Sequence, residues 1–304
     1  MTRPLKVGVQ LPEVEYVASW PQLREMARTA EAVGLDSVWL GDHLLYRWAD
    51  APSRGPWEAW TSLTAIAAVT ERVQIGPLVA CTSFHNPAML AKKAATLDEI
   101  SGGRLVLGLG AGWNEPEYSA FGFPYDHRVS RFEEAFTIIR TLLRDGRCDF
   151  DGTYYQVRDC ELLPRGPRSD GPPLMVGSEG ERMLGITLPH VQAWNAWFAW
   201  FDNDVDRYRE LRGRIDAACR AAGRDPAEVE RTAALFVGFP DSVGRSLGDR
   251  TAPDTRPLPG EPEPLAAALR EFAAEGVGHV QLVLDPISAE SIARLEPLLA
   301  LLDA

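Results

Sequence analysis

The sequence predicts an α/β protein folded as a (β/α)8 TIM barrel with insertions, including a long loop after strand seven. Two observations support this prediction: strand-like and helix-like segments alternate along the chain, and eight of the segments are strand-like. The length of 304 residues is ordinary for one barrel, and 45% hydrophobic residues can form a large core. No segment indicates a domain boundary, so we expect residues 1–304 to form a single domain.

The strand predictions rest on short apolar or β-branched runs. These runs cover residues 6–11, 37–43, 73–81, 104–112, 174–178, 192–198, 232–239 and 279–284. The helix predictions rest on apolar residues at helical spacing. These helices cover residues 21–34, 60–70, 87–103, 129–146, 181–189, 204–223 and 288–302. Asp151 and Gly152 predict a hairpin turn, and the Pro- and Gly-rich segment 240–263 predicts the long loop.

The composition argues against several partners. A formal net charge of −12 and a pI near 5.0 disfavour nucleic acid and anionic membrane surfaces. The five histidines lack the paired spacing of a metal site, and the four cysteines form no C-x-x-C motif. The chain begins without an apolar export segment and has no run long enough to span a bilayer. We therefore expect a cytoplasmic protein with reduced thiols and no bound metal.

The sequence GLGAGW, residues 108–113, raises the question of a nucleotide-binding loop. A dinucleotide fingerprint, G-x-G-x-x-G, needs its third glycine at the position of Trp113 and then a helix. The residues that follow include Pro116, and we do not expect them to begin a helix. Gly108, Gly110 and Gly112 are better placed at the end of the fourth strand, where a flat ring could approach the backbone. Their other interpretation is that they only relieve crowding in the barrel.

Active sites of TIM barrels lie at the C-terminal ends of the strands, so polar residues there are candidates. The second predicted strand ends in Gly41, Asp42 and His43, which brings a carboxylate next to an imidazole. The third strand is followed by the hydroxyls of Thr82 and Ser83. We predict that Asp42 and His43 are functional, although a lone histidine is more often structural.

Two further patterns have a functional and a structural interpretation. Gly177, Ser178 and Gly180 precede a predicted helix, so backbone N–H groups there could bind a phosphate if Glu179 and Glu181 point away. The same residues could form an ordinary turn. Tryptophans in and after strand six could line a planar cofactor together with Trp113, or they could fill the core. They are Trp194, Trp197 and Trp200.

Four ordered motifs resemble the luciferase-like monooxygenase superfamily, specifically its flavin- or coenzyme F420-dependent oxidoreductases. The motifs occupy residues 30–43, 83–104, 107–122 and 176–182, and the resemblance covers nearly the whole chain. It implies that an isoalloxazine or deazaflavin ring binds at the barrel mouth against strands three and four. It also implies a homodimer.

The resemblance implies roles for particular residues. His43 would lie beside the reactive carbon of the ring as the acid or base, and Asp42 would orient or tune it. A cis peptide bond on strand three, near Leu78 and Val79, would support the ring, and residues 177–181 would bind the cofactor phosphate. The expected cofactor-binding residues are Leu78, Val79, Thr82, Ser83, Gly110, Ala111, Gly112, Trp113, Gly177, Ser178, Glu179, Gly180, Glu181 and Trp194.

The chain also departs from the family pattern. Bacterial luciferases have an arginine on the flavin phosphate where this chain has Ala111, which favours F420 over FMN. The ring-side glutamate of members specific for glucose 6-phosphate aligns with Trp113, which argues against a sugar phosphate. The common A-D-G-W-N of strand six is V-Q-A-W-N here, with Gln192 and Ala193 in place of Asp and Gly.

We therefore predict an oxidoreductase that transfers a hydride between F420 and a small organic substrate. His43 would move the proton, while Trp48, Trp113 and the loop 240–263 would shape the substrate side. The first alternative is an FMN-dependent monooxygenase that uses O2 and receives reduced flavin from a separate reductase. Two others are a non-catalytic flavin-binding barrel and a cofactor-free barrel hydrolase or isomerase.

Overall fold

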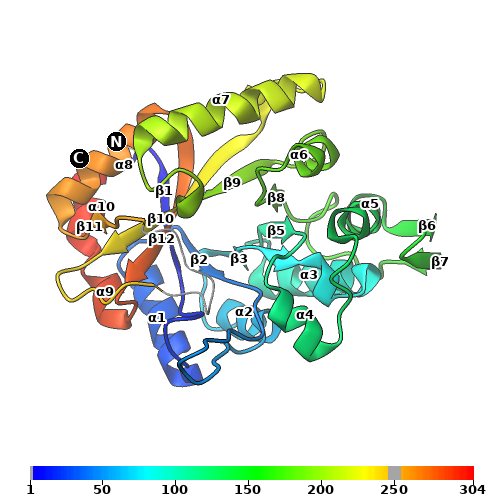
Figure 1. The fold of residues 1–304 in the computed structure, drawn as a ribbon, viewed down its shortest axis with the longest axis horizontal. Helices are drawn as coiled ribbons and strands as arrows, with labels where there is room; N and C mark the ends of the chain where they lie inside the picture. The colour runs from blue at the N-terminus through cyan, green and yellow to red at the C-terminus, as the bar shows by residue number, and fades with distance from the viewer. Residues whose placement is uncertain (1–2, 246–254) are drawn as a thin grey trace.

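A computed structural model describes residues 3–245 and 255–304, and within them nine parallel strands form a barrel (Figure 1). Around the barrel their order is β3-β2-β1-β12-β10-β9-β8-β5-β4. The strands are β1 (Lys6–Gln10), β2 (Ser37–Leu40), β3 (Gln74–Pro77), β4 (Ala80–Cys81), β5 (Leu107–Gly110), β8 (Leu174–Val176), β9 (Ala193–Trp197), β10 (Glu230–Gly238) and β12 (Val277–Asp285).

The two ends of this strand order are halves of one strand. Only residues 78 and 79 separate β3 from β4, and Ile75 of β3 also forms a bridge to Leu105 just before β5. The sheet therefore closes on itself. Counting β3 and β4 together gives eight strand positions, so the predicted TIM barrel is confirmed.

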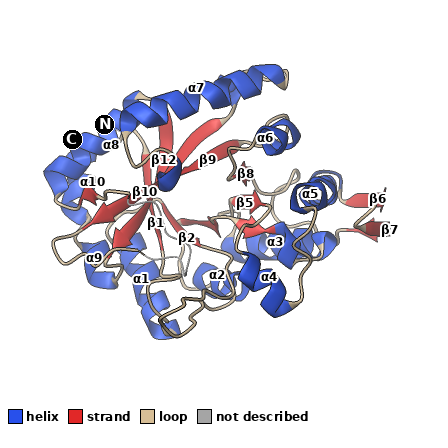
Figure 2. Cartoon of the chain, viewed as in Figure 1, coloured by secondary structure: helices blue, strands red, loops and turns tan. Residues whose placement is uncertain are grey.

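Helices cover the outside of the barrel (Figure 2). They are α1 (Trp20–Ala32), α2 (Ala59–Ala67), α3 (Pro87–Ser101), α4 (Glu115–Phe121), α5 (Arg128–Asp145), α6 (Glu181–Thr187), α7 (Val205–Ala221), α8 (Pro262–Ala274), α9 (Ala289–Ala293) and α10 (Glu296–Asp303). In α1 the apolar residues Leu23, Met26, Ala27 and Ala30 recur at helical spacing and are buried. In the part of the chain that the structure describes, no helix is long and apolar enough to cross a membrane.

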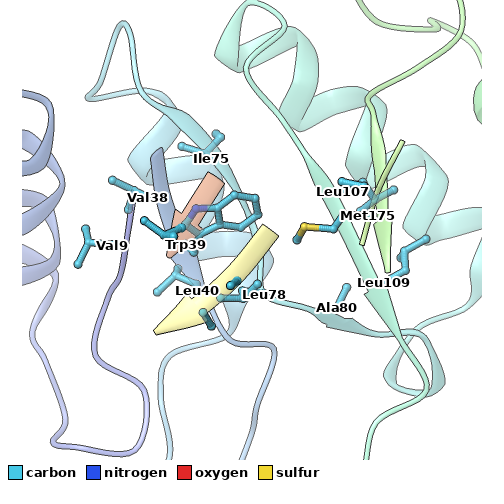
Figure 3. Packing of buried hydrophobic residues seen from close by; sticks show 14 of the residues in the cluster. Val9, Val38, Trp39, Leu40, Ile75, Leu78, Ala80, Leu107, Leu109 and Met175 are labelled. Atoms are coloured by element: carbon cyan, nitrogen blue, oxygen red, sulfur yellow. The ribbon is translucent and has the colours of Figure 1, made fainter. Parts of the chain in front are cut away.

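Apolar side chains of neighbouring strands form a continuous core. Figure 3 shows Val9, Val38 and Ile75 at one side of this core and Leu107 and Leu109 at the other. All five are fully buried, with no measurable exposure. The core is built from strands along the whole described sequence, which fixes the relative positions of the loops at the strand ends.

Two predictions about single elements are wrong. Residues 115–121 form α4 although Pro116 lies within it, because proline in the first turn removes only an N–H that has no partner in the helix. The segment 240–263 is not loop throughout. It contains the short strand β11 (Leu258–Pro259), which pairs with β10, and the start of α8. Residues 240–245 and 255–257 belong to no helix or strand, as predicted, and residues 246–254 lie outside the described residues.

The predicted hairpin is confirmed, and it consists of β6 (Arg147–Asp151) and β7 (Gln156–Glu161). Gly152 follows β6 directly, and its N–H donates to the carbonyl of Tyr155 at 3.0 Å. The hairpin lies beyond the end of α5, at the edge of the molecule (Figure 1).

The glycines of GLGAGW make room for a bulge between β3 and β4. The peptide bond between Leu78 and Val79 is cis, as the family resemblance implies. A Cβ on Gly108 would lie 2.3 Å from the carbonyl oxygen of Pro77 and 2.9 Å from Val79 Cγ1. A Cβ on Gly110 would lie 2.8 Å from Val79 Cγ2. The space beside these glycines is therefore not left free for a flat ring, because the side chain of Val79 fills it.

We expect Gly108→Ala to destabilise the protein by about 1–3 kcal/mol, since the added methyl group meets backbone that cannot move aside easily. A matched control is Gly185→Ala in α6, where an added Cβ has no atom within 4 Å. That change should stabilise by roughly 0.5–1 kcal/mol. Urea denaturation measures both effects, and equal stability of the two variants would contradict the close approach at Gly108.

Candidate active site

A cavity of about 510 Å³ opens at the C-terminal ends of the barrel strands. Its volume lies in the usual range for small-molecule sites, roughly 300–1,000 Å³. The lining residues come from segments far apart in the sequence. They are Glu13, Asp42, His43, Tyr46, Leu78, Val79, Cys81, Phe84, Gly110, Ala111, Gly112, Trp113, Glu117, Gly177, Ser178, Glu179, Gly180, Met183, Asn195, Trp197, Ala199, Trp200 and Arg245.

Most of the residues predicted from the sequence lie in this lining. The structure brings together Asp42, His43, Leu78, Val79, the segment 110–113 and the segment 177–180. Four predicted cofactor residues do not belong to the lining of the cavity. These are Thr82, Ser83, Glu181 and Trp194.

Physical reasons account for three of these four positions. Trp194 is fully buried, and its indole N–H donates to the carbonyl of Ser178 at 2.7 Å, so it supports the cavity wall from behind. Thr82 is buried, and its hydroxyl donates to the carbonyl of Gly110 at 3.3 Å. Ser83 is buried as well. Trp194 and Thr82 thus hold backbone that faces the cavity instead of facing it themselves.

His43 is held at the cavity between two carboxylates. Its Nδ1 lies 2.9 Å from Glu117 Oε2, and its Nε2 lies 3.8 Å from Glu13 Oε1. The ring of Trp113 packs edge-on against the imidazole, with centroids 5.4 Å apart. Because Nδ1 already has a hydrogen-bond partner, Nε2 is the nitrogen that can reach a bound substrate.

Glu117 belongs to α4, and its carboxylate binds the start of the loop that follows His43. One carboxylate oxygen accepts the backbone N–H groups of Leu44 at 2.5 Å and Leu45 at 3.0 Å. Burial raises the pKa of Glu117. The hydrogen bond and charge of His43, together with these two N–H groups, lower it by more, so the pKa lies below its ordinary value. Glu117 is therefore an ionised carboxylate with 1% of its side chain exposed.

Glu13 lies directly beyond β1 and has several partners. Gln10 Nε2 donates to Glu13 Oε2 at 2.6 Å, and the hydroxyl of Tyr46 donates to Oε1. Arg245 Nη2 lies 3.6 Å from Oε1. A Cβ at Gly41 would lie 1.9 Å from Glu13 Oε2, so a larger residue there would displace the Glu13 carboxylate.

Arg245 comes from the segment after β10 and carries a buried positive charge into the site. Its Nε donates to Glu15 Oε1 at 2.6 Å, and its guanidinium lies 5.3 Å from the ring centre of Trp197. Only 4% of its side chain is exposed. Arg245 thus balances part of the negative charge of Glu13 and Glu15.

The neighbours of His43 stabilise its charged form. Burial alone lowers the pKa of His43, but the charge of Glu13, the hydrogen bond and charge of Glu117, and the charge of Asp42 together raise it to about 9. The ordinary value is 6.5. His43 is therefore an imidazolium near neutral pH and can donate a proton.

The prediction for Asp42 is that it orients or tunes His43. The hydrogen bonds of its carboxylate go to other residues, so only the tuning role, through its charge, finds support. Asp42 Oδ2 accepts the backbone N–H of Cys81 at 2.9 Å and lies 2.8 Å from His85 Nε2. It therefore positions β4 and His85, while Glu117 orients His43. On the charge of His43, Asp42 has a smaller influence than Glu13 or Glu117.

Sequence reasoning missed Glu13, Glu117 and Arg245. Glu13 follows the first strand, so the rule that selected Asp42 and His43 at a strand end also applies to it. Glu117 lies inside the motif 107–122, but we expected no helix there to direct it towards His43. For Arg245, no local pattern in the segment 240–263 indicates burial.

The fold and the site define a TIM barrel with an acid–base cluster at its mouth. A family model described as luciferase-like monooxygenase matches residues 5–242. The chain therefore belongs to the luciferase-like monooxygenase family, as its motifs indicate.

Proteins of similar sequence carry both expected activities. F420-dependent glucose-6-phosphate dehydrogenase of Kineococcus radiotolerans is 30% identical over 253 residues, which are 81% of this chain and 71% of the relative. Pyrimidine monooxygenase RutA of Cronobacter sakazakii is 34% identical over 174 residues, covering 55% of this chain and 50% of the relative. The match thus spans about half the length of the monooxygenase. These relatives agree with the prediction of an oxidoreductase.

Solved structures confirm the fold. An F420-dependent secondary alcohol dehydrogenase in complex with an F420–acetone adduct has a TM-score of 0.80 and 20% identity, covering 100% of both chains. A riboflavin lyase with modified FMN and riboflavin has a TM-score of 0.81 and 17% identity, covering 98% of this chain and 91% of that chain. Deazaflavin and flavin thus both occur in proteins with this fold.

We expect His43 and His279 to affect stability with opposite dependence on pH. His43 has a pKa of about 9 when folded and 6.5 when unfolded, so its stabilisation is complete below pH 6.5 and is lost as pH rises through 9. Burial and the charge of Lys6 lower the pKa of His279 to about 3, so His279 destabilises the fold as pH falls below 6.5.

The measurement is the difference in free energy of unfolding between the wild type and His43→Gln, followed from acid to alkaline pH. The same series with His279→Gln is the control. The free energy of unfolding of the wild type minus that of His43→Gln should decrease as pH rises from 6.5 through 9. The free energy of unfolding of the wild type minus that of His279→Gln should decrease as pH falls below 6.5. A flat His43 curve would show that its carboxylate neighbours do not hold the proton.

Proposed function

We propose that this protein is an oxidoreductase that transfers a hydride between coenzyme F420 and a small uncharged organic substrate. The observation that carries the proposal is His43 held between the carboxylates of Glu13 and Glu117, which favour its protonated form, at a cavity whose lining includes Gly110, Gly112, Gly177 and Gly180. A proton donor fixed beside a place for a flat ring suits the reduction of a carbonyl group, which takes up one hydride and one proton.

The lining residues fit a planar ring. Val79 and residues 110–112 form one side, where Gly110 and Gly112 contribute no side chain of their own, and residues 177–180 form the adjoining side. At Gly180 an added Cβ would have only Ser178 Oγ near it, at 3.9 Å, so this part of the wall is open. When bound, F420 would supply or accept the hydride. Ala111, in place of the flavin-phosphate arginine of bacterial luciferases, supports F420 over FMN.

His43 would transfer the proton through Nε2. Glu117 fixes the orientation of the imidazole through Nδ1, so a substrate oxygen in the cavity would receive the proton from Nε2. After the transfer, the nearby carboxylate of Glu13 favours recovery of a proton from solvent. The opposite reaction, oxidation of an alcohol, needs the neutral imidazole and is favoured as pH approaches 9.

The charge of the cavity supports an uncharged substrate. Among the residues that the structure describes, four carboxylates line it, and the positive side chains in the lining are His43 and Arg245. Arg245 is already engaged with Glu13 and Glu15. A phosphate placed next to His43 would face Glu13 and Glu117, so a sugar phosphate like that of the Kineococcus relative is disfavoured. Trp113, Trp197 and Trp200 instead offer apolar surface.

The second candidate function is that of an FMN-dependent monooxygenase, which the similarity to RutA favours. Identification of the bound cofactor separates the two candidates. The protein would be produced in a host that makes both F420 and FMN, and the released cofactor would be weighed by mass spectrometry. We expect a deazaflavin with a polyglutamyl tail, and recovery of FMN alone would contradict the proposal.

Replacement of His43 tests the proton transfer. In His43→Ala we expect kcat to fall about a hundredfold or more, because a positioned acid has gone, while the Kd of F420 changes little. His190→Gln, at an exposed histidine outside the cavity, is the matched control and should keep the wild-type kcat. Full turnover by the His43→Ala enzyme would show that another group moves the proton.

A further inference from the structure

The hairpin of β6 and β7 places two of the four cysteines opposite each other. Cys148 of β6 and Cys160 of β7 are direct partners in the antiparallel register. Both are free thiols. The hairpin lies apart from the barrel, beyond α5 (Figure 1), and neither cysteine lines the cavity.

The register brings the two side chains within reach of each other. Directly opposed residues of an antiparallel pair project to the same face, with Cβ atoms about 4.5–5.5 Å apart and Cα atoms about 4.5–5.5 Å apart. A disulfide needs Cα atoms about 4.4–6.8 Å apart and Cβ atoms about 3.5–4.5 Å apart. The Cα separation therefore already suits a disulfide, and the Cβ atoms must approach by up to about 1 Å as the bond forms. Both side chains also pack against the same hydrophobic core. Burial raises the pKa of the Cys148 thiol, and the nearby Cys160 raises it further.

We propose that Cys148 and Cys160 form an oxidation site that a peroxide converts into a cross-strand disulfide. This inference does not depend on the proposed function, because the pair lies outside the cavity.

The two thiols differ in exposure, which sets the order of the reaction. Cys160 is half-buried and can meet the oxidant first, whereas Cys148 is buried. Peroxide oxidises the Cys160 thiol to a sulfenic acid and is itself reduced to water. The sulfur of Cys148 then attacks the sulfur of Cys160, and the S–S bond forms as a second water leaves. The pair loses two electrons in total, and one molecule of hydrogen peroxide accepts them.

The other two cysteines provide an internal comparison. Cys81 is buried with its Sγ 3.2 Å from the hydroxyl of Tyr118, and burial raises its pKa to about 12. Cys219 belongs to α7 and is fully buried, and its sulfur accepts a hydrogen bond from Arg231 at 3.7 Å. Neither faces a partner thiol across a strand pair, so both should stay reduced under the same mild treatment.

The disulfide would enclose the turn of the hairpin, which α5 already holds. Glu134 of α5 accepts the backbone N–H groups of Thr153, Tyr154 and Tyr155, each at 2.8–3.0 Å. A covalent link at the base of this turn restricts the unfolded chain and should raise the Tm of the oxidised protein.

The test is treatment of the whole folded protein with hydrogen peroxide, followed by alkylation, digestion without reductant and mass spectrometry. We expect one cross-linked peptide pair joining Cys148 to Cys160, lighter by two hydrogen atoms than the reduced pair, and its disappearance after treatment with reductant. Cys81 and Cys219 should be recovered alkylated after unfolding.

The variants Cys148→Ser and Cys160→Ser are matched controls. Cys148→Ser should accumulate Cys160 as sulfenic or sulfinic acid, because the second thiol is missing, and Cys160→Ser should resist oxidation. Formation in the wild type of sulfinic acid at Cys160, with Cys148 still free, would overturn the proposal. A disulfide between two molecules through Cys160 would overturn it as well.

Discussion

Negative charge enclosed at the barrel mouth is the constraint on which the site depends. Glu13 and Glu117 have 5% and 1% of their side chains exposed, and an ionised carboxylate in such a place needs compensating partners. His43 supplies one positive charge between them, and Arg245 supplies another beside Glu13. Loss of the proton of His43 would leave two carboxylates around a neutral ring, which explains why the imidazolium is the resting form.

The barrel makes this arrangement possible by joining segments that are far apart in sequence. Glu13 follows β1, His43 follows β2, Glu117 belongs to the helix after β5, and Arg245 follows β10. The parallel strands end on the same side of the barrel, so all four side chains reach one cavity. The bulge at Val79 gives the adjoining wall its shape, and Gly108, Gly110 and Gly177 accept the side chain of Val79. Acid–base chemistry and cofactor fit thus depend on neighbouring parts of one sheet.

The sequence predicted the barrel because periodic apolar runs report burial directly, and it located His43 because strand ends can be recognised locally. The partners of His43 could not be found in this way. The contact between Glu117 and His43 spans 74 residues and depends on a helix that Pro116 led us to reject. Asp42 is next to His43 in sequence, yet its carboxylate reaches His85. Adjacent residues leave a strand end in different directions, and only the folded backbone shows which neighbours meet.

The protonation state of His43 is the most direct test of this account. Nitrogen-15 NMR of protein labelled at histidine reports whether one or both ring nitrogens carry a proton, and loss of the signals in His43→Gln assigns them. The account predicts protons on both nitrogens near neutral pH, with deprotonation only as pH rises to about 9. A neutral ring with one proton at neutral pH, titrating near the ordinary value of 6.5, would contradict it.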